Sequence, residues 1–153
     1  MKYITLPQNK QVIVDDEDYE ELSKYKWHLS NGYAVRHVST KPDIREYMHR
    51  KINDTPKGLV TDHINGNKLD NRKSNLRTAT VSQNAMNSGK LSNTTNPYRG
   101  VSLHKKTGLW RARIQIDGKA WTVGYYKTPE EARDVYAVAA EAFFGNFVRA
   151  GYI

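Results

Sequence analysis

A polar, turn-rich stretch interrupts this chain of 153 residues at positions 88–97. Its sequence, Ser-Gly-Lys-Leu-Ser-Asn-Thr-Thr-Asn-Pro, has no helical or strand period of hydrophobic residues and has the composition of a linker. The segments on either side are short, so each can bury only a small core. We therefore predict two small α+β domains, at 1–88 and 96–153, joined by a linker at 89–95.

The composition excludes several classes of protein. The chain has no cysteine, which excludes disulfides, thiol catalysis and thiolate zinc sites. It has no apolar run near the roughly 18 residues that a transmembrane helix needs, and no secretory signal at the N-terminus. We expect a cytoplasmic protein that is neither secreted nor bound to a membrane.

The net charge of +8 is unevenly distributed along the chain. Residues 1–54 carry nine Lys/Arg and nine Asp/Glu, whereas residues 55–127 carry thirteen against three, and residues 128–153 two against four. A positive charge concentrated in one segment favours a polyanionic partner, and duplex DNA binds such surfaces by counterion release. The alternative is a solubilising face, but confinement of the charge to one segment weighs against it.

The first domain is predicted to be built from short elements. Lys10–Val14 alternates as a strand does, the acidic residues 15–18 begin a helix that ends near Lys24, and residues 30–32 form a hairpin turn. Residues 46–52 fit either a strand or a short helix.

A strand–strand–helix order follows, with Gly58–His63 as a strand, a turn at 65–67 and Asn75 on a second short strand. The helix Thr80–Asn87 completes the order, with Thr80 as its N-cap.

These elements bring together residues suited to phosphodiester chemistry. Asp62 and Asn84 offer the hard oxygen ligands that Mg²⁺ and Mn²⁺ prefer. The ordinary pKa of a histidine such as His63 suits the removal of a proton from water, and the Asn75 side-chain oxygen is a candidate to hold the imidazole in one tautomer.

Taken alone, Asp-His-Ile-Asn-Gly-Asn at residues 62–67 is an ordinary hairpin loop. The full pattern of residues and spacings, from Asp62-His63 to Asn75 and Asn84, however, resembles the HNH nuclease family. The resemblance is to its His-Asn-Asn variant, which occurs in phage homing endonucleases. Matching neighbours are His49-Arg50, Gly58-Leu59-Val60, residues 69–72 and Asn75-Leu76-Arg77. The resemblance implies a ββα-metal fold and cleavage that leaves a 5′-phosphate and a 3′-hydroxyl. It assigns catalysis to His63 and Asn75, and a metal (Mg²⁺ or Mn²⁺) that stabilises the scissile phosphate to Asp62 and Asn84.

The residues around this motif are candidates for other roles. His49 and Arg50 are candidate phosphate contacts, although a structural or orienting role suits His49 better. Asn71 and Arg72 either hold the loop or meet the DNA backbone, and we include Arg72 and Arg77 among the expected DNA contacts.

The second domain is predicted to contain three strands, at 99–104, 109–116 and 119–126, with a hairpin turn at Asp117-Gly118. Thr128-Pro129-Glu130-Glu131 begins a helix that ends near Gly145. Its expected apolar stripe is Ala132, Val135, Tyr136, Ala139, Ala140 and Phe143. Alternation along the strands places Val101, Leu103, Trp110, Ala112, Ile114, Trp121 and Val123 toward the helix.

This pattern resembles the ethylene-response-factor (AP2) domain of plants, in which a three-stranded antiparallel sheet packed on one helix lies in the DNA major groove. The expected DNA-binding face is Arg99, His104, Arg111, Arg113, Gln115 and Lys119. Arginine and glutamine can pair with guanine and adenine edges respectively. Ser102, Gln115 and Thr122 depart from the plant pattern, so the plant target sequence is not carried over.

We therefore predict a metal-dependent homing-type endonuclease that acts on double-stranded DNA as a monomer or weak dimer. It would mainly nick, act in the cytoplasm of a phage-infected bacterium and take no small-molecule substrate. One alternative is a DNA-binding regulator whose nuclease part has lost cleavage. Another is an RNA-binding protein, which would need bases to stack on Tyr125 or Tyr126.

Overall fold

The structure is a computed structural model that describes residues 1–88 and 96–149. The chain forms two compact units, Met1–Thr80 and Val81–Ile153, and each is described by itself. The predicted linker at 89–95 lies outside the described residues. Among the described residues, no helix is long and apolar enough to cross a membrane.

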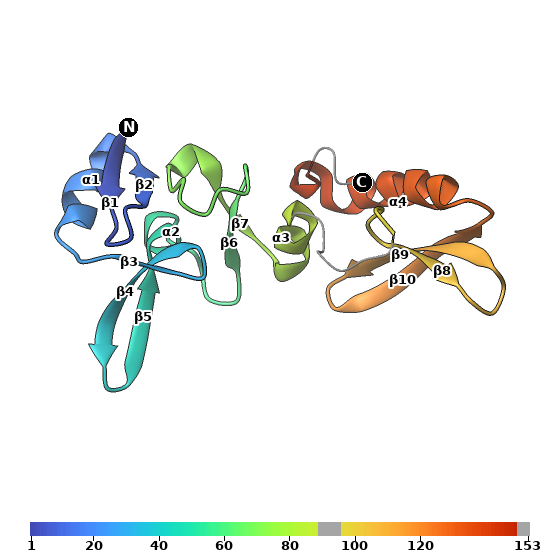
Figure 1. The fold of residues 1–153 in the computed structure, drawn as a ribbon, viewed down its shortest axis with the longest axis horizontal. Coiled ribbons are helices and arrows are strands. Elements are labelled where there is room, and N and C mark those ends of the chain that lie inside the picture. The colour runs from blue at the N-terminus through green and yellow to red at the C-terminus, as the bar shows by residue number, and fades with distance from the viewer. Residues whose placement is uncertain (89–95, 150–153) are drawn as a thin grey trace. The chain divides into compact units, whose positions relative to one another are not determined.

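The first unit begins with a hairpin of β1 (Lys2–Thr5) and β2 (Gln11–Val14), followed by α1 (Asp16–Ser23). Its three-stranded sheet has the order β3-β4-β5, formed by β3 (His28–Ser30), β4 (Tyr33–Thr40) and β5 (Asp43–Tyr47). The outer part of the β4–β5 hairpin projects away from the rest of the unit (Figure 1). The core of this unit holds the buried apolar residues Leu6, Val12, Val14, Leu22, Trp27, Ala34 and Met48.

The remaining elements of the first unit are α2 (Met48–Ile52), β6 (Val60–His63), the 3₁₀ turn η1 (Lys73–Asn75) and β7 (Leu76–Ala79). Residues 46–52, for which the sequence left two choices, therefore contain the end of a strand and then a helix. β6 and β7 pair antiparallel, with Asp62 opposite Arg77 and His63 opposite Leu76. Asn75 ends η1 immediately before β7, so the prediction that it lies on the strand is wrong by one residue.

The second unit contains α3 (Val81–Asn87), β8 (Val101–His104), β9 (Leu109–Ile116), β10 (Lys119–Tyr126), α4 (Pro129–Phe144) and the 3₁₀ turn η2 (Gly145–Phe147). The sheet order is β10-β9-β8 and all pairs are antiparallel, as predicted. α4 packs on this sheet and begins with a capping box, in which the Thr128 hydroxyl accepts from the Glu131 N–H. The fold is therefore the predicted α+β class, with a sheet packed on one helix.

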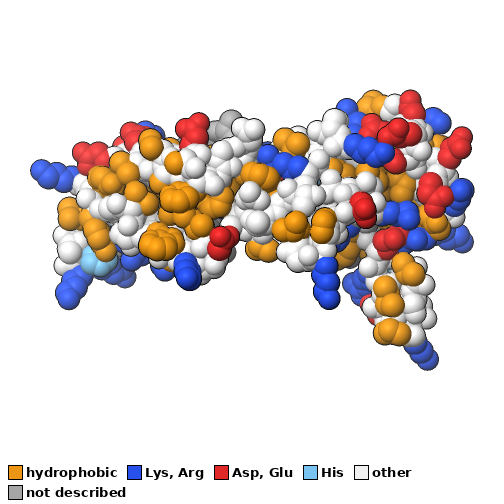
Figure 2. Space-filling model, turned by 180° about the vertical axis from the view of Figure 1, so that it is seen from behind, with side chains coloured by type: hydrophobic (Ala, Val, Ile, Leu, Met, Phe, Trp, Pro, Cys, Tyr) orange, Lys and Arg blue, Asp and Glu red, His pale blue; other side chains and the backbone are white. Residues whose placement is uncertain are grey.

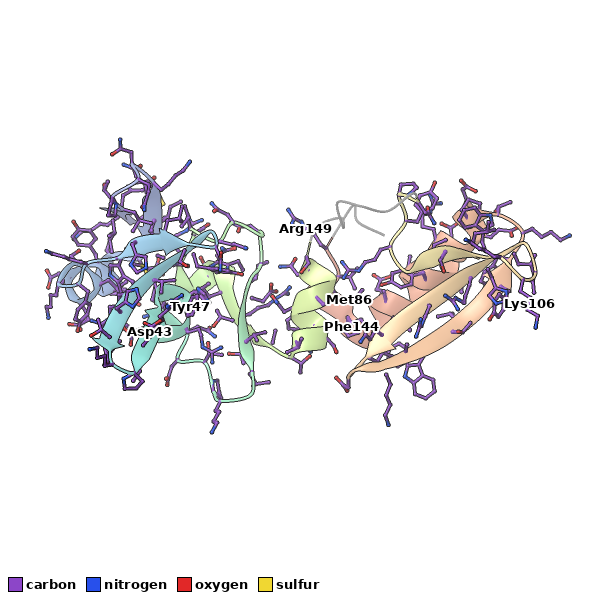
Figure 3. All side chains as sticks on the ribbon, turned by 60° about the horizontal axis from the view of Figure 1, so that its bottom comes forward. Asp43, Tyr47, Met86, Lys106, Phe144 and Arg149 are labelled. Carbon is purple, nitrogen blue, oxygen red and sulfur yellow. The ribbon has the colours of Figure 1, made fainter. Side chains whose placement is uncertain are left out.

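α3 is part of the core of the second unit. Met86 is 5% exposed and packs in the same cluster as Val101, Tyr136 and Phe144. Met86 and Phe144 lie close together where α3 meets the end of α4 (Figure 3). The Ser82 hydroxyl also accepts from the Asp117 N–H in the β9–β10 turn.

Three sequence-based expectations of burial in this unit are wrong. Trp121 and Leu103 are 58% and 50% exposed, although each lies opposite an inward residue of β9. β10 and β8 are the edge strands of this sheet, so their side chains have neighbouring strands on one side only. At the end of α4, Phe144 is buried and Phe143 is 62% exposed, which reverses the expected choice.

Candidate nuclease site and nucleic-acid interface

Asp62 and His63 end strand β6 and are both buried, with 3% and 5% exposure. Neighbouring residues of a strand point to opposite faces, so the two side chains have different surroundings. The Asp62 carboxylate accepts from Arg77 Nε at 2.7 Å, because the β6–β7 register sets these residues opposite each other. The pair therefore combines a buried anion with a buried imidazole.

Asn71 holds the imidazole of His63. Its carboxamide oxygen lies 2.8 Å from His63 Nε2, and Asn71 itself is fully buried. An amide oxygen can only accept a hydrogen bond, so in this orientation the proton of neutral His63 is on Nε2 and Nδ1 carries the lone pair. The sequence analysis treated Asn71 only as a loop or backbone contact and missed this role.

Asn75 differs from the expectation that its side chain holds His63. Its side-chain oxygen accepts from the Asn65 N–H at 3.0 Å, and its amide donates to the Asp70 carbonyl at 2.8 Å. Its backbone carbonyl accepts from Ile64 N–H at 2.9 Å. Asn75 thus ties the two ends of the loop after β6 to each other.

The N-terminal hairpin fixes the position of Asn71. Strand β2 pairs with the loop through two backbone hydrogen bonds of 2.8 Å, from Ile13 N–H to the Leu69 carbonyl and from Asn71 N–H to the Ile13 carbonyl. The Lys73 N–H adds a bond to the Asp15 carboxylate at 2.8 Å. The first strands therefore act as scaffold for the site.

Both arginines that we expected to contact DNA from this unit form ion pairs with buried carboxylates. Arg72 makes two hydrogen bonds of 2.7 Å to Asp70, and Arg77 pairs with Asp62. The guanidinium beside Asp70 lowers the pKa of that carboxyl. In this structure they neutralise buried acids, and their contact with DNA stays a prediction.

His49 packs against the His63 ring, with 5.1 Å between ring centroids. Tyr33 and Tyr47 flank His49 at 4.9 and 5.5 Å, and the His49 side chain is 7% exposed. Burial, with the neighbouring His63 and Arg50, lowers the pKa of His49 to about 3. A neutral, buried ring cannot act as a cationic phosphate clamp, so the packing role fits His49 better. Arg50 is partly exposed and donates to the Leu59 carbonyl at 3.2 Å.

The charge state of His63 also follows from its surroundings. Burial lowers its pKa, while the hydrogen bond to Asn71 and the charges of Asp62 and Asp70 raise it in part. The Lys68 ammonium lowers it further. The net direction is downward, so His63 is neutral at physiological pH and can accept a proton.

Few groups in the described residues suit a metal ion. Within residues 1–88 and 96–149, no group of three or more His, Asp or Glu side chains is arranged so that it could hold a metal ion. Asp62 supplies a buried carboxylate, the type of donor that Mg²⁺ and Mn²⁺ prefer, although Arg77 already occupies one side of it. Asn84, the other predicted ligand, lies on α3 in the second unit. The donor types therefore fit a metal that keeps several water ligands.

The outward face of the second sheet carries most of the predicted DNA contacts. Arg113 and Gln115 are exposed on β9, while Arg111 lies between Ser102 and Tyr125 on the neighbouring strands. His104 contacts the Tyr125 ring at 5.2 Å. Acidic side chains gather on the α4 side of this unit, and Lys and Arg side chains lie mainly on the side of the sheet (Figure 2).

Two of the predicted contacts in this unit lie elsewhere. Arg99 donates to the Ser88 carbonyl at 2.9 Å and to the Ala85 carbonyl, so it caps the C-terminal end of α3. Lys119 is exposed but pairs with Ile116 at the start of β10, on the inward side of the register. Arg111, Arg113, Gln115 and His104 therefore lie on the outward face of the sheet, and their contact with DNA stays a prediction.

Known proteins resemble both parts of the chain. A model of the HNH endonuclease family matches residues 54–86, which include Asp62, His63 and Asn75. An uncharacterised HNH endonuclease of Acanthamoeba polyphaga mimivirus is 33% identical over 129 residues, which are 82% of this chain and 66% of that protein. Protein 3.8 of Escherichia phage T7 is 36% identical over 64 residues, which are 42% of this chain and 53% of that protein.

A known plant protein also matches part of the chain, in line with the AP2 resemblance. An AP2-like ethylene-responsive transcription factor of Oryza sativa subsp. japonica is 37% identical over 79 residues, 50% of this chain and 12% of that protein. No solved structure matches the chain. The chain spans at most about two thirds of the length of these curated relatives. It carries an HNH endonuclease region, and this region is joined to an AP2-like region at the C-terminal end.

Proposed function

We propose that this chain is a metal-dependent DNA endonuclease in which the first unit cleaves and the second unit binds the duplex. The observation that carries the proposal is the buried Asp62–His63 pair, with the His63 imidazole held by Asn71, inside the segment that matches the HNH family. A buried neutral imidazole with a fixed tautomer is suited to general base catalysis.

His63 removes a proton from the attacking water through Nδ1. Asn71 accepts from Nε2–H and keeps the ring in this tautomer. As the proton arrives, the imidazole becomes cationic, and the nearby Asp62 and Asp70 charges stabilise that form. His49 and Tyr33 pack against the ring and help to hold its orientation.

Mg²⁺ or Mn²⁺ is the proposed cofactor, with Asp62 as its ligand in the first unit and Asn84 as the ligand predicted from the sequence. When bound, such an ion stabilises negative charge on the scissile phosphate and the leaving oxygen. Asp62 must then share its carboxylate between the ion and Arg77, which is the counter-ion in this structure.

The AP2-like sheet is proposed to supply most of the DNA affinity. Arg113 and Gln115 are exposed and project from the same strand face, where their side chains can reach base edges in the major groove. The resemblance to phage homing enzymes adds three finer proposals: nicking by a monomer or weak dimer, a 5′-phosphate and 3′-hydroxyl at the cut, and a homing role.

Supercoiled-plasmid cleavage with Mg²⁺, Mn²⁺ or EDTA tests the proposal, with wild type compared with His63→Ala. We expect open circles from wild type only when metal is present, and a rate about 10²- to 10⁴-fold lower for the variant. Absence of cleavage on a plasmid that the protein binds would favour the second candidate function, a DNA-binding regulator. The Arg77–Asp62 ion pair favours that candidate, because it already neutralises the metal ligand.

A further inference from the structure

The cationic side chains around His63 are of two kinds. Arg72 and Arg77 are paired with the buried carboxylates of Asp70 and Asp62. Lys68, in the loop after β6, lowers the pKa of His63 by its charge and is exposed. In the part of the chain that the structure describes, no carboxylate lies within ion-pair distance of Lys68.

Three features of the β3–β4 turn hold the Lys68 side chain in place. Its Nζ donates to the Asn31 carbonyl at 3.2 Å and lies 4.4 Å from the centroid of the Tyr33 ring. Between these residues, a Cβ at Gly32 would come within 3.1 Å of Lys68 Cδ. Gly32 also has a φ of +84°, which L side chains rarely adopt. The turn therefore accommodates Lys68 and fixes its ammonium over Tyr33.

This position is close to the proposed base. The Tyr33 ring centroid lies 6.0 Å from that of His63, so the Lys68 ammonium is within about 10 Å of the imidazole. One DNA strand carries a phosphate about every 3.4 Å along the helix axis. An ammonium has three donors and Asn31 takes one, which leaves donors for phosphate oxygens. At this distance from His63, the ammonium is positioned to meet either the phosphate that His63 would serve or a neighbouring phosphate of the same strand.

We propose that Lys68 binds a non-bridging oxygen of the scissile phosphate or of its neighbour on the cut strand, and so positions that strand for attack by water. The inference rests on the proposed nuclease function. It assigns the phosphate contact of the first unit to a residue that neither the sequence pattern nor the matching families singled out.

Lys68→Met is compared with Lys68→Arg and with Lys10→Met, a charge-matched change at an exposed lysine in the β1–β2 turn. Single-turnover cleavage is measured at saturating DNA, and affinity is measured separately in EDTA. A hydrogen bond to a charged group corresponds to a rate change of about 10- to 150-fold, so Lys68→Met should slow cleavage by at least about tenfold. Lys68→Arg should retain most of the rate, and Lys10→Met should remain within about twofold.

The affinity measured in EDTA distinguishes a contact at the cut site from general charge attraction. Lys68→Met should change it by less than about threefold, because loss of one exposed cation among many has a small effect. Equal rates for Lys68→Met and Lys10→Met, with wild type active, would overturn the assignment of Lys68 alone. Absence of wild-type cleavage would overturn the nuclease proposal and this inference together.

Substrates with a neutral methylphosphonate at single positions around the mapped cut identify the phosphate directly. At the position that Lys68 contacts, the substitution should slow wild type by about tenfold and slow Lys68→Met no further. Additive losses at every position would contradict the contact. Lys68→Met should unfold at the wild-type denaturant midpoint, which shows that the variant is folded.

Discussion

The two units place their polar side chains in opposite ways. Of the eight buried polar residues in the described chain, seven belong to the first unit and only Asn87 to the second. In the first unit, His63 and Asn71 are hydrogen-bonded to each other, and Asp62 accepts from Arg77. On the sheet of the second unit, Arg113 and Gln115 are exposed to solvent.

This difference separates two requirements. A catalytic base must be held within a fraction of an ångström before substrate arrives, and buried mutual hydrogen bonds achieve this. Side chains that contact base edges must lose their hydration and adjust their conformation to the groove. Exposed residues on a strand are able to do both. Under the proposed function, the chain meets both requirements by burying the polar groups around His63 and leaving Arg113 and Gln115 on the surface.

The largest expected effect is on cleavage by Asp62→Ala. Loss of a metal ligand removes several kcal/mol of transition-state stabilisation, so the rate should fall at least about a hundredfold. DNA affinity, supplied by the sheet, should stay within about twofold. The control is Asp62→Ala combined with Arg77→Met, which avoids leaving Arg77 without its carboxylate.

Asn84→Ala extends the same test to the second unit. We expect cleavage to be lost and DNA affinity to be retained, because the sequence predicts a ligand at Asn84. If affinity fell in parallel with cleavage for this variant, the ligand assignment would be wrong. Gel-shift titration in EDTA and plasmid nicking measure the two properties separately.

Met86→Ala tests whether α3 belongs with the sheet. Truncation of this 5%-exposed side chain should destabilise the second unit by about 2–5 kcal/mol. The matched control is Met48→Ala, which removes a fully buried methionine from the core of the first unit. Hydrogen exchange measured segment by segment should show faster opening in residues 98–148 for the first variant and in residues 1–80 for the second. The same pattern for both variants would refute the division into two units.

Arg113→Ala should weaken binding to a specific site by about 1–3 kcal/mol, with residual non-specific nicking retained. Arg133→Ala is the control, because Arg133 lies on α4 and pairs with Asp134. Fluorescence anisotropy with specific and scrambled duplexes measures the effect. Loss of all nicking by Arg113→Ala would contradict the division of labour between the units.

The smallest expected effect is a pH dependence confined to the first unit. The pKa of His49 is about 3 when folded against 6.5 as the ordinary value, so only the unfolded chain takes up this proton as pH falls below 6.5. Stability of the first unit should therefore decrease from pH 6.5 downward, with a slope of at most about 1.4 kcal/mol per pH unit from this residue. Hydrogen exchange at pH 7 and pH 5 measures it, and His49→Phe should reduce the slope.

Much of the fold could be predicted from the sequence, because the turns and helix starts are determined by residues close together in the chain. Asp117-Gly118 and the run from Thr128 to Glu131 define a turn and a helix start through their own backbone preferences, and both predictions are confirmed. The exposure of Trp121 depends instead on its place on an edge strand, which strand alternation does not report.

The site was predictable in its residue types and less so in its contacts. Asp62 and His63 are recognisable from spacing, but the partner of His63 is Asn71 because β2 pairs with a loop more than fifty residues away in sequence. Arg77 likewise meets Asp62 only through the β6–β7 register. Lys68 carries no motif signal, since its position depends on the turn at Gly32.

Because α3 packs in the core of the second unit, it limits where domains can be recombined, in evolution or in engineered chimeras. A crossover at residues 89–95 would separate Met86 from Tyr136 and Phe144, and leave an apolar helix face without its partner. A crossover before Val81 keeps that core intact but transfers Asn84 with the incoming segment. Folded chimeras should therefore carry the helix together with the sheet, and if Asn84 is the proposed metal ligand, an active chimera also needs an asparagine at the equivalent position.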